Sequence, residues 1–207
     1  MKSESSASSL KGRIYLITPL AEDFPLEKDA AYAGVDAGYL KLLEKGIDPV
    51  FVLGDFDSLD PGQKPPVGAL RVPIRKDEPD SELAVAEAIK DGYSEIILWG
   101  AISGRLDHTL ANIRLAVWKY PGLILQDEMQ KAFVLLPGRY SIAPEYRHLS
   151  FFAMELSVFS ENNVSYPLDH RKIDQEDLYT LSNSFLEGPA EIEVHSGRIL
   201  CVLSNCI

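Results

Sequence analysis

Two hydrophobic patterns divide the chain at about residue 130. Before it, short and nearly continuous apolar runs alternate with stretches in which apolar side chains recur at helical spacing. The runs predict buried strands and the periodic stretches predict helices. The expected strands are 13–18, 50–53, 69–72, 95–99 and 122–126, and the expected helices are 39–45, 81–90 and 106–118. Because strands and helices alternate, this part is expected to form an α/β domain with a mostly parallel, Rossmann-like sheet.

After residue 130 the helical period disappears. Short β-type runs at 131–137, 148–156, 191–195 and 199–203 are separated by turn residues such as Gly138 and Asn163. Short strands divided by turns are typical of an all-β sandwich or barrel. The predicted organisation is a disordered start at 1–12, an α/β domain at 13–130 and an all-β domain at 131–207.

The composition is that of a globular protein and limits its partners. The 207 residues are 46% hydrophobic and 25% charged, which supplies a sizeable core. The formal net charge of -11 gives no general attraction for phosphate backbones, so nucleic acid is not expected as a partner. An anionic substrate would need a local cluster of arginine and lysine, or metal ions, to offset its charge.

The two ends of the chain indicate a cytoplasmic protein. Met1 to Ser9 is rich in serine and lacks the apolar centre of a signal peptide, and no later run reaches membrane-spanning length. Cys201 and Cys206 are too few and too poorly spaced for a zinc site or a disulfide framework, which favours free thiols in a reducing compartment. We therefore expect no membrane partner.

Two aspartates follow the apolar run at 50–53. Asp55 and Asp57 are separated by Phe56, and in an extended chain residues two apart point the same way. Two like charges on one side repel each other unless a cation lies between them, and Mg²⁺ is the hard, oxygen-seeking ion to expect. The alternative is a polar turn that caps the strand. These residues alone leave both interpretations open.

Further carboxylates follow other expected strands: Asp36, Asp77 with Asp80, and Asp107. Taken singly, Asp36 fits a turn, Asp80 fits a helix N-cap and Asp107 fits the first turn of a helix. In a parallel sheet such loops converge on one edge, which is where ligands bind. Their common position favours a cation site over a set of unrelated turns.

The expected helix at 106–118 begins with a polar group. Arg105, His108 and Asn112 lie at spacings of three and seven, so they share one helix face. Much of the opposite face carries an apolar stripe, made of Leu106, Leu110, Ile113 and Val117. Because a helix N-terminus favours phosphate, the polar face suits a nucleotide, and a solvated surface is the alternative. Lys76 is another cation near the expected sheet edge.

Four motifs, in order, carry a resemblance to one enzyme family. They are Val35-Asp36-Ala37-Gly38, which is like Asp-Gly-Gly, then Gly54-Asp55-Phe56-Asp57-Ser58, then residues 76–80, which are like Lys-Asp-x-Thr-Asp, and Gly104-Arg105-Leu106-Asp107-His108 with Asn112. Val164-Ser165-Tyr166-Pro167-Leu168, Leu181-Ser182-Asn183 and Phe185 join them near the carboxyl end. From about Ile14 onward the chain resembles the thiamine pyrophosphokinase family.

The resemblance implies an α/β domain followed by a β-sandwich, in a homodimer. It implies transfer of the pyrophosphoryl group of ATP to the hydroxyl of thiamine, giving thiamine diphosphate and AMP, with Mg²⁺ as cofactor. Residues 13–130 would then form the nucleotide- and metal-binding catalytic domain, and residues 131–207 the thiamine-binding domain.

The resemblance also implies roles for individual residues. Metal binding falls to Asp36, Asp55, Asp57 and Asp77. The catalytic residues are Asp57, Asp77 and Asp80. The nucleotide is held by Lys76, Arg105, Asp107, His108 and Asn112. Ser182 and Asn183 line the thiamine pocket.

Three positions depart from the family pattern: Ala37 for glycine, Pro79 for threonine and Thr180 for glycine. Ala37 adds a methyl where backbone approaches a ligand, and Pro79 removes a hydroxyl and a backbone donor. No carboxylate is lost, so retained chemistry is expected. The alternatives are a magnesium-dependent phosphohydrolase, and a non-catalytic thiamine- or nucleotide-binding protein on the same fold.

Overall fold

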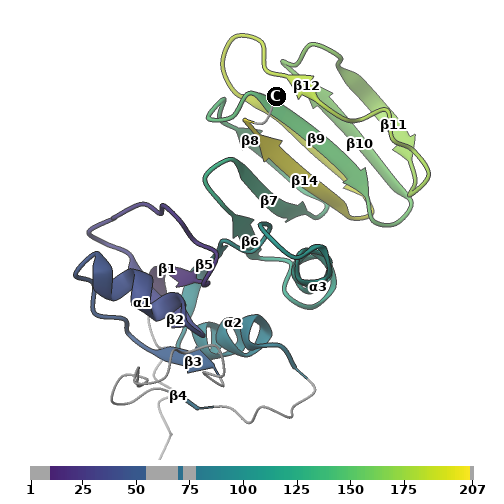
Figure 1. The fold of residues 1–207 in the computed structure, drawn as a ribbon. Coiled ribbons are helices and arrows are strands. Elements are labelled where there is room, and N and C mark those ends of the chain that lie inside the picture. The colour runs from purple at the N-terminus through teal and green to yellow at the C-terminus, as the bar shows by residue number, and fades with distance from the viewer. Residues whose placement is uncertain (1–9, 55–69, 72–77, 206–207) are drawn as a thin grey trace, which may run out of the picture. The chain divides into compact units, whose positions relative to one another are not determined.

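The computed structural model describes residues 10–54, 70–71 and 78–205 (Figure 1). The chain divides into two compact units, Met1–Ala101 and Ile102–Ile207. The described chain is mostly β with few helices. None of the described helices is long and apolar enough to cross a membrane. The domains predicted at 1–12, 13–130 and 131–207 rest on sequence patterns and stay a prediction.

Parallel strands and two helices form the described part of the first unit. The elements are β1 (Lys11–Ile17), β2 (Ala31–Val35), α1 (Gly38–Glu44), β3 (Val52–Gly54), β4 (Leu70–Arg71), α2 (Asp80–Lys90) and β5 (Tyr93–Trp99). The strands lie in the order β5-β1-β2-β3-β4, and each neighbouring pair is parallel. Their carboxyl ends therefore lie at one edge of the sheet, where ligands bind in sheets of this kind.

Two glycines let α1 lie close to this sheet. A Cβ atom added at Gly38, the first residue of α1, would lie 2.0 Å from the carbonyl oxygen of Ile17 in β1. A Cβ atom added at Gly34 in β2 would lie 2.5 Å from the Cβ of Tyr39. Both distances are shorter than any normal contact, so only glycine fits where the backbones approach.

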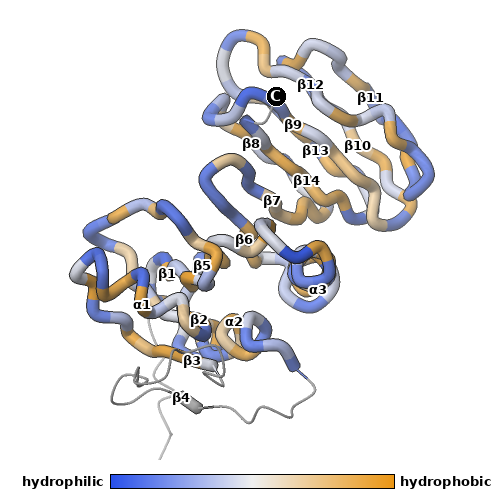
Figure 2. Tube along the Cα trace, in the orientation of Figure 1, coloured by the Kyte–Doolittle hydropathy of each residue, from blue (hydrophilic) through white to orange (hydrophobic). Residues whose placement is uncertain are grey.

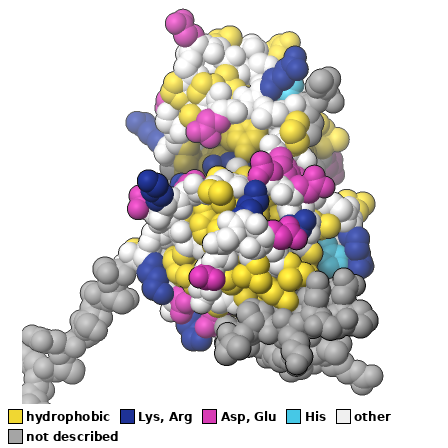
Figure 3. Space-filling model, turned by 60° about the vertical axis from the view of Figure 1, so that its left-hand side comes forward, with side chains coloured by type: hydrophobic (Ala, Val, Ile, Leu, Met, Phe, Trp, Pro, Cys, Tyr) yellow, Lys and Arg dark blue, Asp and Glu magenta, His cyan; other side chains and the backbone are white. Residues whose placement is uncertain are grey.

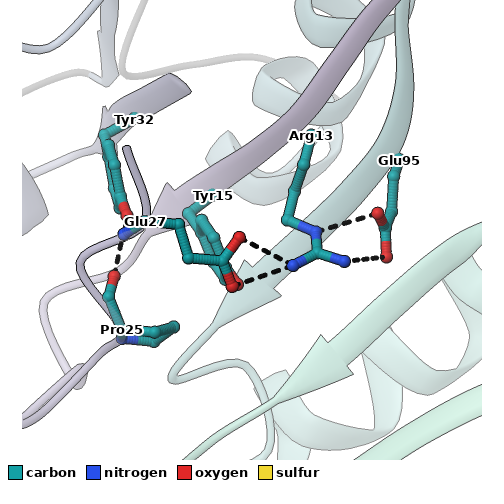
Figure 4. Close-up of polar contacts among 6 residues, drawn as sticks. All are labelled: Arg13, Tyr15, Pro25, Glu27, Tyr32 and Glu95. Atoms are coloured by element: carbon teal, nitrogen blue, oxygen red, sulfur yellow. Dashed lines mark hydrogen bonds and ion pairs between the residues drawn. The ribbon is translucent and has the colours of Figure 1, made fainter. Parts of the chain in front are cut away.

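A network of charged and phenolic side chains fixes the loop before β2 to the sheet (Figure 4). The Arg13 guanidinium in β1 contacts Glu95 of β5 through Nε at 2.8 Å and Glu27 of the loop through Nη1 at 2.7 Å. Tyr15 donates its hydroxyl to Glu27 at 2.7 Å, and the N–H of Glu27 donates to the Tyr32 hydroxyl at 2.8 Å. The loop is thereby held by β1 and β2 together.

Glu27→Gln is expected to lower the free energy of unfolding by about 1 kcal/mol at neutral pH, since the contacts are partly exposed to solvent. The hydrogen bond from Tyr15, helped by Arg13, holds the pKa of Glu27 below its ordinary value. A lowered carboxyl pKa stabilises the fold above the ordinary value, and that stability is lost as the pH falls through the folded pKa. Urea unfolding at about pH 7 and again at about pH 3 would measure both effects. On acidification, Glu27→Gln should lose less stability than the native protein.

Glu44→Gln, at the exposed end of α1, is the control for that variant. It should leave the urea midpoint unchanged at either pH. Equal stability of native protein and Glu27→Gln would mean that the network does not hold the loop.

The second unit consists of a helical segment followed by antiparallel strands. Its elements are α3 (Leu106–Arg114), a π-helical turn (Leu115–Lys119), β6 (Leu123–Gln126), β7 (Gln130–Leu135), β8 (Gly138–Ile142), β9 (His148–Ala153), β10 (Ser157–Asn162), β11 (Leu168–Ile173), β12 (Asn183–Ser184), β13 (Ala190–Ser196) and β14 (Ile199–Ser204). Antiparallel pairs give the orders β6-β7-β14-β9-β12 and β11-β10-β13-β8.

These two antiparallel sheets pack face to face on one hydrophobic core. Phe151 of β9 and Phe159 of β10 are fully buried, and their ring centroids lie 5.4 Å apart. β14, which contributes Cys201 and Leu203 to the same core, is hydrophobic along most of its length (Figure 2). Inward apolar side chains from both sheets form a single layer, which is how two antiparallel sheets bury their faces.

The π-helical turn is anchored to the residue that precedes β14. Arg198 donates through Nη1 to the carbonyl oxygen of Val117. Its guanidinium carbon also lies 4.8 Å from the centroid of the Trp118 ring. The carboxyl end of the helical segment is therefore held by a hydrogen bond and a cation–π contact.

The buried face of α3 differs from the predicted one. Leu106 is 72% exposed and Leu110 is 52% exposed, whereas Asn112 is 8% exposed. Val117, in the π-helical turn, is fully buried. The prediction that Leu106 and Leu110 begin a stripe opposite a polar face of Arg105, His108 and Asn112 is therefore wrong as a guide to burial. Periodicity shows which residues share a face, but the packing of the helix decides which face is covered.

Candidate functional site

Asp36 lies at the carboxyl edge of the parallel sheet, beside the end of β3. It follows β2 with a φ of 52°, and its N–H donates to the carbonyl oxygen of Leu53 at 2.7 Å. A Cβ atom added at Gly54 would lie 2.8 Å from the Cα and 3.1 Å from the Oδ1 of Asp36. Aspartate tolerates this left-handed backbone, and glycine at 54 leaves room for the carboxylate. The ends of β2 and β3 thus form a narrow cradle around one carboxylate.

Four predicted site residues lie outside the described residues: Asp55, Asp57, Lys76 and Asp77. Their roles stay predictions. The chain enters 55–69 from Gly54, which contacts Asp36. The predicted metal ligand at position 55 therefore follows directly on the described cradle.

Asp80 is the first residue of α2, and Pro79 is the N-cap. Pro79 has a φ of -68° and a ψ of 156°, and its carbonyl oxygen accepts the N–H groups of Glu82 at 3.0 Å and Leu83 at 3.2 Å. The interpretation of Asp80 as an N-cap is therefore wrong, and it is instead an acidic first-turn residue, which the helix dipole favours. The departure at Pro79 is compatible with the helix, because the N–H of an N-cap makes no intrahelical bond.

Three of the predicted nucleotide-binding residues gather at the N-terminus of α3. Arg105 contacts Asp107 through Nη2 at 2.6 Å and Nε at 3.1 Å, and Asp107 accepts the N–H of His108 at 3.0 Å. The Arg105 guanidinium holds the pKa of Asp107 below its ordinary value. All three side chains are exposed, whereas Asn112 is buried on the same helix. An exposed ion pair is weak, so the guanidinium can exchange its carboxylate for a phosphate.

The surface charge does not by itself attract anions. On the face drawn in Figure 3, acidic and basic side chains lie interspersed over the described surface. The whole chain carries a formal net charge of -11. Local groups such as a helix N-terminus therefore have to supply anion recognition.

The two predicted thiamine-binding residues differ in exposure. Ser182 is exposed, has a φ of 54°, and donates its N–H to the Ser150 hydroxyl at 2.9 Å. Asn183 is 4% exposed, and its amide accepts the N–H of Tyr166 at 3.1 Å and donates to the carbonyl oxygen of Tyr166 at 3.0 Å. Ser182 therefore faces outward while Asn183 ties two segments together.

Thr180, a departure from the family pattern, has a structural use. Its hydroxyl donates to the carbonyl oxygen of Phe151, and its own carbonyl oxygen accepts the N–H of Phe151 at 2.9 Å. The side chain is buried beside β9. A glycine here would lose the hydroxyl contact while keeping the backbone bond.

Glu161 was not predicted, although it lies beside Asn183. It is 2% exposed, and burial raises its pKa to about 7 although the hydrogen bond from Asn183 opposes the rise. Glu161 follows Phe159 at the two-residue spacing of an inward-facing strand position. An inward glutamate in an alternating pattern is the signal that could have identified it.

Glu161 is expected to make stability fall as pH rises. The folded state keeps a proton that an ordinary glutamate with a pKa of 4.5 releases, so stability declines between that value and about 7. The shift corresponds to a loss of about 3 kcal/mol across this range. Urea unfolding at a series of pH values would show the decline in the native protein and not in Glu161→Gln. Glu191→Gln, an exposed change in β13, should keep the native decline, and an equal decline in Glu161→Gln would contradict the assignment.

Only some of the predicted metal ligands are described. Among the residues that the structure describes, no group of three or more His, Cys, Asp or Glu side chains is arranged to hold a metal ion. Asp36 supplies one carboxylate next to the chain that continues into Asp55 and Asp57. Carboxylate oxygens suit Mg²⁺, so the donor set fits the predicted ion.

Comparison with known proteins identifies the family. Residues 25–124 match the family model described as thiamin pyrophosphokinase, catalytic domain. A thiamine pyrophosphokinase of Bacillus subtilis (strain 168) is 28% identical over 194 residues, covering 86% of this chain and 89% of that protein.

Solved structures agree over nearly the whole length. A crystal structure of a thiamin pyrophosphokinase from Geobacillus thermodenitrificans is 30% identical, with a TM-score of 0.80 and coverage of 93% of this chain and 96% of that chain. The crystal structure of the Bacillus subtilis thiamine pyrophosphokinase has a TM-score of 0.83 at 24% identity, covers 94% of this chain and 100% of that one, and shows the shared fold. With the four motifs in order, these likenesses establish that the chain belongs to the thiamine pyrophosphokinase family.

Proposed function

We propose that this chain transfers the pyrophosphoryl group of ATP to the hydroxyl of thiamine. The thiamine oxygen attacks the β-phosphorus in line, the bond from that phosphorus to the α,β-bridging oxygen breaks, and AMP leaves as thiamine diphosphate forms. The observation that carries the proposal is the 30% identity to a thiamin pyrophosphokinase of which this chain covers 96%. The resemblance in all four motifs also supports it.

The proposal also assigns a role to each of the two parts of the chain. Residues 13–130 form a Rossmann-like α/β domain for nucleotide and metal, and residues 131–207 form a β-sandwich for thiamine. The parallel order of β1 to β5 supports the first part, and the two packed antiparallel sheets support the second. We further propose a cytoplasmic homodimer.

Magnesium is the proposed cofactor, held by Asp36 together with Asp55, Asp57 and Asp77. When bound, it neutralises charge on the phosphate oxygens. The cradle of Gly54 around Asp36 supports this assignment, because it orients a carboxylate at the sheet edge. Asp57, Asp77 and Asp80 are the proposed catalytic residues. Their task is to align the reacting groups, since phosphoryl transfer needs little covalent help.

The nucleotide is proposed to bind at α3. Arg105 releases Asp107 and pairs with phosphate oxygens, and the first-turn N–H groups of α3 add a second attraction. His108 is a further exposed contact, and Asn112 is a buried support on the same helix. Lys76 is proposed as another cation for the nucleotide. Ser182 is the proposed contact to thiamine and Asn183 its neighbour in the pocket.

Mass spectrometry of products tests the proposal directly. Native protein incubated with ATP, thiamine and Mg²⁺ should form thiamine diphosphate and AMP in equal amounts. Omitting thiamine should stop AMP formation, whereas a phosphohydrolase would release phosphate with or without thiamine. A protein that binds both compounds by calorimetry and forms no product would be a binding protein, and the proposed reaction would be wrong.

A further inference from the structure

A carboxyl and an amide meet inside the apolar core of the second unit. Glu161 lies in β10 opposite Ile192 of β13, which belongs to the core. Asn183 lies in β12 opposite Leu149 of β9, which belongs to the same core. Because opposite residues of an antiparallel pair point to one face, the two polar side chains enter the core from facing sheets.

The Asn183 side chain makes three hydrogen bonds to neighbouring backbone. An amide offers two N–H donors and two acceptor lone pairs. The Oδ1 atom accepts the N–H groups of Tyr166 at 3.1 Å and Ser184 at 3.0 Å. The Nδ2 atom donates to the carbonyl oxygen of Tyr166 at 3.0 Å. The same amide lies close enough to the Glu161 carboxyl to act on its pKa. The amide is therefore held mainly by backbone groups of Tyr166 and Ser184.

The Glu161 carboxyl destabilises the fold at its buried position. The side chain is 2% exposed, and within the described part of the chain its Oε2 atom is buried without a hydrogen-bond partner. A buried polar atom left without a partner destabilises a fold, and an apolar residue of similar volume would avoid the cost. A carboxyl at such a position points to a use beyond packing.

The link from Glu161 leads to the segments that carry Ser182 and Tyr166. Asn183 follows Ser182, whose left-handed backbone is held by the Ser150 hydroxyl. The N–H of Ser165 donates to the carbonyl oxygen of Ser184 at 2.9 Å, so the two segments lie side by side. One buried amide therefore sets the position of both segments, and one buried carboxyl orients that amide.

We propose that Glu161 is a positioning residue of the thiamine site and acts through Asn183. The inference rests on the proposed function and sharpens it. Ser182 contacts thiamine, and Asn183 holds Ser182 and the Tyr166 backbone in place. Loss of the Glu161 carboxyl removes one of the groups that fix this amide, and the spacing of the two segments becomes less tightly held.

Two variants and two substrates test the proposal by steady-state kinetics. Glu161→Leu fills the core, so the protein should still fold. Because the substitution removes the side-chain acceptor, the KM for thiamine should rise about tenfold, which corresponds to the loss of about one hydrogen bond. The KM for ATP should stay within about twofold of native, and Glu161→Gln, which keeps a side-chain acceptor, should restore the KM for thiamine. A native KM for thiamine in Glu161→Leu, an equal rise for both substrates, or a Gln variant as defective as the Leu variant would each overturn the proposal.

Hydrogen exchange measured without substrate separates this inference from the proposed function. The amides of Tyr166 and Ser184, which donate to Asn183, should exchange faster in Glu161→Leu than in native protein and at the native rate in Glu161→Gln. Glu191→Gln should change neither amide. A native protein that forms no thiamine diphosphate overturns the function alone, and unchanged exchange in Glu161→Leu overturns the positioning role alone.

Discussion

Asp36→Asn is expected to lower kcat for thiamine diphosphate formation about 100-fold or more. Asparagine keeps the shape of the side chain and tolerates the φ of 52° at this position, so the fold should be unaffected. What is lost is the negative charge at the carboxyl edge of the sheet. The midpoint of activation by Mg²⁺ should therefore move to a higher concentration, and added Mg²⁺ should recover part of the rate.

Asp29→Asn supplies the matched control for this change. Asp29 is exposed and lies just before β2, whereas Asp36 lies just after it, so the two carboxylates flank the same strand. The control should retain the native kcat and the native Mg²⁺ midpoint. An Asp36→Asn enzyme with an unaltered Mg²⁺ midpoint would remove Asp36 from the proposed metal ligands.

Gly38→Ala is expected to destabilise the first unit by about 3 kcal/mol or more. The new Cβ atom would lie 2.0 Å from the carbonyl oxygen and 2.7 Å from the carbonyl carbon of Ile17, and 2.8 Å from that of Thr18. These are backbone atoms of a central strand and the residue after it, which no side-chain rotation can move away. Either α1 leaves the sheet or β1 loses its pairing with β2. Urea unfolding should show a lower midpoint than native protein.

Gly12→Ala, in the same strand β1, is the comparison variant. Its nearest neighbour is the carbonyl oxygen of Asp29 at 3.8 Å, an ordinary contact. The free energy of unfolding should change by less than about 1 kcal/mol, since the new Cβ makes only an ordinary contact with backbone. Equal losses in the two variants would show that close approach at Gly38 is not the cause.

The strands that sequence could predict are those with unbroken apolar runs. β1, β3 and β5 carry such runs, because their carboxyl halves are buried. β11 was not predicted, because only its last residue, Ile173, is fully buried among polar neighbours. β2 was not predicted either, since Gly34 interrupts its apolar run. Glycine is needed there because the Tyr39 backbone and Cβ lie close to it. Contacts between residues far apart in the sequence determine whether such segments form strands.

The candidate site was predictable to the extent that it depends on strand order. Asp36 could be placed at a sheet edge, because parallel strands share one carboxyl edge. Glu161 could not be linked to Asn183, since the register of two facing sheets determines that contact. Asn112 was expected on the face of Arg105, but the packing of α3 buries it. Motif order therefore reveals membership in a family more readily than it reveals which residue touches the substrate.

The contact between Arg198 and the π-helical turn makes the helical segment uneven in local stability. At the far end, Val117 and Trp118 are clamped by one side chain. At the near end, Leu106 and Leu110 are mostly exposed and add little burial. Opening of the first turn should therefore cost less free energy than opening of the last. The proposed phosphate-binding end of α3 can yield to an arriving nucleotide while its far end stays in place.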